Sequence, residues 1–63
     1  MLKRQTLKRG DLITLGYGHT AKMGIVIETH DEYREWPAAT IYMFDEDRRI
    51  RCNQNLYSLE KLT

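Results

Sequence analysis

The sequence predicts an all-β fold in which five short strands wrap into a small barrel. Short runs rich in Ile, Val, Thr, Tyr and Phe, the residues that favour strands, recur along the chain. Glycines, a single proline and clusters of charge separate these runs. The chain has 63 residues, which is room for one domain. Closing the sheet would remove exposed strand edges from so short a chain.

The first two strands are expected over residues 11–15 and 23–30, joined by the glycine-containing loop of residues 16–20. The run from Gly24 to Ile27 is apolar on both faces, as is typical of a strand central to a barrel. Alternation places Met23, Ile25 and Ile27 on one face and Val26 on the other. We expect Ile25 and Ile27 to face the core.

Three more strands are expected over residues 38–44, 48–53 and 57–62. Pro37 cannot donate to a strand ladder, so residues 30–37 form a loop, and residues 45–47 form a tight turn. Residues 54–56 predict a single 3₁₀ turn before the last strand. A helical tail through Leu56, Leu59 and Leu62 stays open as an alternative, because their spacing of three suits a helix. The expected core comprises Leu12, Leu15, Ile25, Ile27, Ile41 and Ile50.

This layout of strands and loops describes an SH3-like barrel, and two segments strengthen the resemblance. Residues 8–15 (KRGDLITL) and 22–28 (KMGIVIE) resemble the opening of KOW-type SH3-like domains, with Gly24 at the position of their central glycine. The second half of the chain is similar in layout to small SH3-like proteins of tailed bacteriophages. The resemblance implies binding of RNA or proteins through loops, and an accessory or structural role in a phage. The acidic loop of residues 30–37 disfavours RNA.

Composition argues against a metal site, a cofactor or catalysis. Cys52 is the only cysteine, so no internal disulfide forms, and a lone thiol fits the cytoplasm or a virion. Its alternation with Ile50 predicts that Cys52 faces inward as a small apolar residue. His19, His30 and Cys52 lack the close spacing of zinc ligands. We therefore expect a soluble protein that is not an enzyme and does not bind a membrane.

The charges are distributed unevenly although the net charge is only +1. Residues 1–22 hold five basic side chains and one acidic, residues 23–47 hold one basic and seven acidic, and residues 48–63 hold four basic and one acidic. Residues 1–9 form a basic N-terminal segment, for which we expect flexibility. Opposed charge patches of this kind orient binding partners, although an ordinary solvated surface of mixed charge is the interpretation that charge runs favour.

Exposed aromatic side chains lead to the main functional hypothesis, a module that binds another protein. Tyr17, Tyr33 and Trp36 fall in the two loops that flank a shared groove in SH3-type barrels, and aromatic residues are the usual anchors of an interface. The alternative for Trp36 is packing beneath its loop as part of a small core.

Two other functions remain open at this stage. One is nucleic-acid binding, for which the basic residues would neutralise phosphates. The other is self-association that weakens with salt, with the basic ends of one copy meeting the acidic middle of another. The basic residues of the first alternative are Lys3, Arg4, Lys8, Arg9, Arg48, Arg49 and Arg51.

Overall fold

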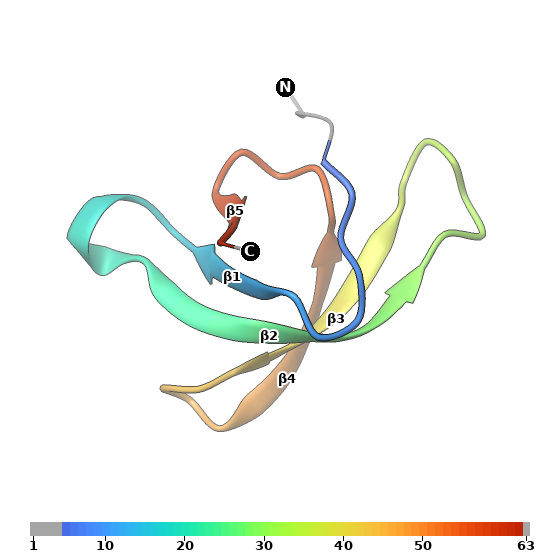
Figure 1. Ribbon diagram of the computed structural model, residues 1–63. Coiled ribbons are helices and arrows are strands. Elements are labelled where there is room, and N and C mark those ends of the chain that lie inside the picture. The colour runs from blue at the N-terminus through green and yellow to red at the C-terminus, as the bar shows by residue number, and fades with distance from the viewer. Residues whose placement is uncertain (1–4, 63) are drawn as a thin grey trace.

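The computed structural model describes residues 5–62, which form five antiparallel strands in one sheet (Figure 1). Their order is β4-β3-β2-β1-β5, so the first and last strands are neighbours. The prediction of five strands in an all-β fold is confirmed, and the first four strands lie within one residue of their expected bounds. The strands are β1 (Leu12–Leu15), β2 (Lys22–His30), β3 (Ala38–Met43), β4 (Arg48–Asn53) and β5 (Leu59–Lys61).

The sheet is open, with β4 and β5 at its two edges, so closure into a barrel is not confirmed. β5 has only three residues and pairs only with β1. Gln5 holds the connection between the two edge strands. Its Nε2 donates hydrogen bonds to the carbonyl oxygens of Gln54, at 2.6 Å, and Leu59, at 2.9 Å. Leu7 is buried in the core, so this part of the N-terminal segment packs against the sheet.

The connections differ from the predictions in two places. The 3₁₀ helix is η1 (Gly18–Thr20), between β1 and β2, and not at residues 54–56. There, two hydrogen-bonded turns carry the chain from Asn53 to Leu59. The helical alternative for the tail is wrong, because residues 59–61 form β5. Within residues 5–62, η1 is the only helix, and no helix there is long and apolar enough to cross a membrane.

The core lies on one face of the sheet, which we call the inner face. Ile41 is buried in this core, as expected, together with Ala39 and Met43, which alternation along β3 places on the same face. Leu15, Ile50 and Cys52 are partly buried against this cluster, as expected. The largest fully buried side chains are Ile13, Val26, Ile41 and Leu59.

The expected positions of Leu12, Ile25 and Ile27 in the core are wrong. Ile13 and Val26 face the core, whereas Leu12 and Ile25 are paired with each other on the opposite side, which we call the outer face. Ile27 lies where the register of β2 shifts between Val26 and Glu28, so it is the extra residue of a β-bulge. Because β2 is apolar on both sides, alternation alone did not determine which side is buried.

Gly24 explains why β2 presents Val26 to the core. Gly24 is buried on the inner face, against β3. A Cβ atom there would lie 2.8 Å from Ile41 Cγ2, 2.8 Å from the Tyr42 carbonyl oxygen and 2.9 Å from Met43 Sδ. Shifting β2 by one residue would bring the larger side chain of Met23 or Ile25 into that space. The close packing of β2 on β3 therefore requires glycine at this position.

Substituting Gly24→Ala tests this close approach. The added methyl group must displace the backbone or core of β3, so we expect the free energy of unfolding in urea to fall by about 1–3 kcal/mol. At an uncrowded strand position, the same substitution would raise stability by roughly 0.5–1 kcal/mol. A variant as stable as the wild type, or more stable, would contradict the close packing.

Candidate protein-binding site

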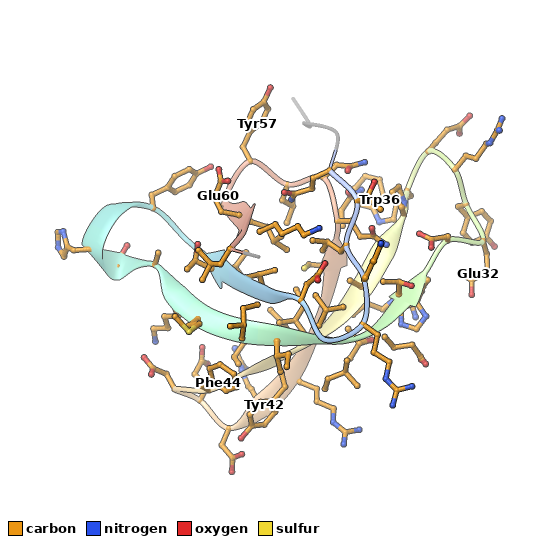
Figure 2. The ribbon with its side chains drawn as sticks, viewed as in Figure 1. Glu32, Trp36, Tyr42, Phe44, Tyr57 and Glu60 are labelled. Carbon is orange, nitrogen blue, oxygen red and sulfur yellow. The ribbon has the colours of Figure 1, made fainter. Side chains whose placement is uncertain are left out.

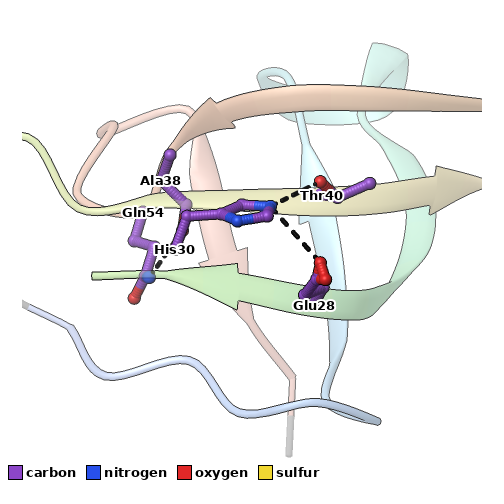
Figure 3. Close-up of polar contacts among 5 residues, drawn as sticks. All are labelled: Glu28, His30, Ala38, Thr40 and Gln54. Carbon is purple, nitrogen blue, oxygen red and sulfur yellow. Dashed lines mark hydrogen bonds and ion pairs between the residues drawn. The ribbon is translucent and has the colours of Figure 1, made fainter. Parts of the chain in front are cut away.

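The β2–β3 loop (residues 31–37) is fixed at both ends by Gln54, which is buried. The Gln54 Nε2 donates to Asp31 Oδ1 at 2.9 Å. It also donates to the Ala38 carbonyl oxygen at 2.8 Å, as Figure 3 shows. The Gln54 backbone N–H donates to the Pro37 carbonyl oxygen at 2.8 Å. Asp31 begins the loop and Pro37 ends it. One residue of the β4–β5 connection therefore determines the position of the whole loop.

Two aromatic side chains of this loop are exposed to solvent. Tyr33 is 71% exposed and Trp36 is 61% exposed. A turn joins them, because the Trp36 backbone N–H donates to the Tyr33 carbonyl oxygen at 3.1 Å. The alternative in which Trp36 packs beneath its loop is wrong. Tryptophan is highly buried on average, so an exposed one on an ordered loop is unusual.

The same loop has an acidic surface. Asp31, Glu32 and Glu35 outnumber Arg34, the single basic residue. The Asp31 carboxylate contacts Gln54, and both glutamates are exposed. Figure 2 shows Glu32 and Trp36 projecting from different sides of the loop. The loop therefore combines negative charge with two aromatic rings.

A polar cluster lies where β2 enters this loop. The His30 Nε2 is 2.9 Å from Thr40 Oγ1 and 4.0 Å from Glu28 Oε1 (Figure 3). The side chains of Glu28 and His30 come from β2 and that of Thr40 from β3. These contacts join the two strands at the base of the loop and support its position.

Tyr17 does not lie near the other two aromatic residues. It precedes η1 in the β1–β2 loop, and Figure 1 shows this loop and the β2–β3 loop at opposite ends of β2. A strand of nine residues, as β2 is, spans roughly 26–30 Å. Tyr17 is 70% exposed, but it does not share a groove with Tyr33 and Trp36, contrary to the expectation.

The described basic residues of the nucleic-acid hypothesis come from two segments of the chain. Lys8 and Arg9 precede β1, whereas Arg48, Arg49 and Arg51 belong to β4. Arg48 is paired with an acidic residue, because its Nε lies 2.9 Å from Glu46 Oε2. The pairing of Tyr42 with Arg49 places Arg49 on the outer face of the edge strand β4. Lys3 and Arg4 lie outside the described residues.

Sequence reasoning missed a set of apolar side chains on the outer face of the sheet. Tyr42 and Phe44 form an edge-to-face pair, with ring centroids 5.7 Å apart. The Tyr42 hydroxyl donates a hydrogen bond to Asp47, which raises the pKa of Tyr42. Met23 and Phe44 are both nearly half exposed. The sequence did contain a signal of this face: β2 has apolar residues on both sides. Whichever side does not face the core therefore stays uncovered.

Metal and thiol chemistry find no support in the described part of the chain. Among residues 5–62, no three His, Cys, Asp or Glu side chains are grouped to hold a metal ion. Burial raises the pKa of the Cys52 thiol, which disfavours the reactive thiolate. No family model, curated protein or solved structure matches the chain.

Substituting Gln54→Ala tests whether this residue fixes the loop. The change removes the Gln54 Nε2 donor from the buried Ala38 carbonyl oxygen. We therefore expect the free energy of unfolding to fall by about 1–3 kcal/mol. We also expect trypsin to cleave faster after Arg34, the single basic residue of the loop.

Thr20→Ala is the control. Its hydroxyl also donates a hydrogen bond to a carbonyl oxygen, that of Tyr17 at 2.6 Å, but this bond lies in the β1–β2 loop, at the other end of β2. Cleavage after Arg34 that is equally fast in both variants would show that Gln54 has no specific role in holding the loop.

Proposed function

We propose that this protein is a non-enzymatic module that binds another protein through its β2–β3 loop, with Tyr33 and Trp36 as the apolar anchors. The observation that carries the proposal is the exposure of both rings on a loop whose two ends are fixed by Gln54. Tyrosine and tryptophan are the residues most enriched among those that dominate binding energy. Fixing the loop before binding lowers the entropy lost on association.

The chemistry of the loop favours a partner segment rich in lysine and arginine. Glu32 and Glu35 are exposed acids that neighbour Tyr33 and Trp36 in the sequence of the loop. A cationic side chain is attracted to the face of an aromatic ring, by about 0.5–2 kcal/mol, and to nearby carboxylates. The loop offers both attractions within six residues, 31–36. Complementary charge would also speed association and reject acidic partners.

The SH3-like architecture and the phage accessory or structural role belong to this proposal. Three features support the SH3-like architecture: the neighbouring position of β1 and β5, the long central strand β2, and the bulge that bends β2 at Ile27. The open edge between β4 and β5 departs from a closed barrel. Nucleic-acid binding has weaker support, because Arg48 is paired with Glu46 and the net charge of the chain is only +1.

Trp36 is the only tryptophan, so its fluorescence reports directly on the proposed site. At low salt, we expect a Lys/Arg-rich peptide to change the Trp36 emission saturably, and an Asp/Glu-rich peptide of equal length to leave it unchanged. Added salt should weaken the binding, because ions screen the charges. Tyr33→Ala should raise the Kd at least about tenfold, as expected for an interface anchor.

Tyr17→Ala is the matched control, because Tyr17 is as exposed as Tyr33 but lies at the other end of β2. It should leave the Kd unchanged. The proposal fails if the basic peptide does not change the emission, or if Tyr17→Ala weakens binding as much as Tyr33→Ala does.

A further inference from the structure

The edge strand β4 has one side without a partner strand. Within the sheet it pairs only with β3, and in an antiparallel pair the backbone groups of alternate residues point toward the partner. The Gln54 N–H donates to the Pro37 carbonyl oxygen at 2.8 Å, so this pair is hydrogen-bonded and fixes the alternation. Counted from that pair, Ile50 directs its N–H and C=O groups to β3. Arg49 and Arg51 direct theirs away from the sheet.

The other side of β3 gives the same alternation independently. The Phe44 N–H donates to the Met23 carbonyl oxygen at 3.2 Å, so the backbone groups of Phe44 point to β2. Three residues earlier on β3, those of Ile41 must then point to β4, where Ile41 is paired with Ile50. Both ends of the ladder therefore agree on which residues of β4 face outward.

Two backbone donors and two acceptors are thus open along β4. They belong to Arg49 and Arg51, and no group among residues 5–62 bonds them. The two residues are roughly 7 Å apart along the strand. An extended chain that lies antiparallel to β4 can bond all four groups, because its own N–H and C=O groups repeat at that spacing.

The opposite edge of the sheet is shorter and partly covered. β5 has three residues, and the Gln5 Nε2 donates to the Leu59 carbonyl oxygen at 2.9 Å. β4 has six residues in unbroken register with β3, without a bulge or a proline. Proteins protect a strand edge by shortness, a bulge, a proline, a cover or charge. Of these, β4 has charge.

The charge along this edge is positive. The side chains of Arg49 and Arg51 are exposed on the outer face, where they are paired with Tyr42 and Thr40. Neither guanidinium forms an ion pair with any of residues 5–62. The edge therefore offers open backbone groups between two arginines whose charges are not paired.

The nearest acidic side chains on the outer face contact other residues. Glu28 is in the same row as Arg51, but it lies on β2, roughly 10 Å away across β3. Its carboxylate is 4.0 Å from the His30 Nε2. Asp47 accepts a hydrogen bond from the Tyr42 hydroxyl. A strand added to β4 would lie about 5 Å from Arg51, on the side away from Glu28.

We propose that β4 binds an extended acidic segment of another protein, which joins the sheet as an additional antiparallel strand. The residues of that segment opposite Arg49 and Arg51 are acidic, with their side chains on the outer face beside the guanidinium groups. The residue between them turns to the inner face, next to Ile50, which is only partly buried. The edge therefore selects a segment in which acidic and apolar residues alternate.

Charge also disfavours a second copy as the occupant of this edge. Two β4 strands paired with each other would bring the arginines of one copy beside those of the other, and like charges on neighbouring strands are destabilising. An acidic strand replaces this repulsion by attraction. The proposal is independent of the β2–β3 loop, for which we expect a basic segment.

Backbone methylation of a peptide tests the strand pairing. The probe is a fluorescein-labelled peptide of the same length as β4 that alternates glutamate and valine, and its anisotropy reports binding. We expect a Kd on the order of 10–100 μM, as for a small interface. Methylating the glutamate nitrogens, which face β4, should raise the Kd about tenfold or more. Methylating the valine nitrogens, which face away from β4, is the matched control and should leave the Kd unchanged.

Charge reversal on the protein tests the role of the arginines. Arg51→Glu should raise the Kd of the unmethylated peptide about tenfold or more, because it replaces attraction by repulsion. Arg34→Glu makes the same change of charge on an exposed residue of the β2–β3 loop, so it is the matched control and should leave the Kd unchanged. Circular dichroism confirms that both variants are folded.

Amide hydrogen exchange, followed by NMR, locates the added strand. In the free protein, the N–H groups of Arg49 and Arg51 should exchange faster than that of Ile50, which is bonded to β3. With saturating peptide, exchange at Arg49 and Arg51 should slow about tenfold or more, because both N–H groups then donate to the peptide.

Four results would overturn the proposal. The first is the absence of saturable binding by the peptide. The second is an equal loss of affinity on methylating the glutamate and the valine nitrogens. The third is binding that leaves exchange at Arg49 and Arg51 unchanged, because the peptide would then contact side chains only. The fourth is slow exchange at both residues in concentrated protein without peptide, because a second copy would then occupy the edge.

Failure of this proposal is distinguishable from failure of the proposed function. The probe here is acidic and its readout is at Arg49 and Arg51, whereas the β2–β3 loop is tested with a basic peptide and Trp36 emission. Either site can therefore fail its test without affecting the result at the other.

Discussion

The contact between Gly24 and β3 is the constraint on which the rest of the structure depends. A side chain there would collide with Ile41, Met43 and the backbone of Tyr42, so only glycine lets the two strands approach. Once Gly24 faces inward, alternation turns Val26 to the core and Ile25 away from it. A single missing side chain thus decides which of two apolar faces is buried.

This choice of face separates an inner surface that builds the core from an outer surface that stays partly exposed. The β4–β5 connection folds against the core on the inner face, and it supplies Gln54 to fix the β2–β3 loop. On the outer face, Met23, Phe44 and Leu62 are each 44–50% exposed.

The sequence was sufficient to predict the strands but not their orientation or their closure. Runs of β-favouring residues located four strands within a residue, because strand propensity and turn residues are local properties. Orientation depends on the packing at Gly24, which is a property of two strands together. Loop composition predicted Tyr33 and Trp36 as exposed aromatics. Their separation from Tyr17 follows from the length of β2, and only the arrangement in space shows it.

Thiol labelling tests most directly which face of β2 is buried. Ile25→Cys and Val26→Cys place a thiol on adjacent residues of opposite faces, and the native Cys52, partly buried, serves as an internal reference. We predict that position 25 is labelled in the folded protein and that position 26 is protected until the protein unfolds. Rapid labelling at position 26 together with protection at position 25 would contradict this structure of the sheet.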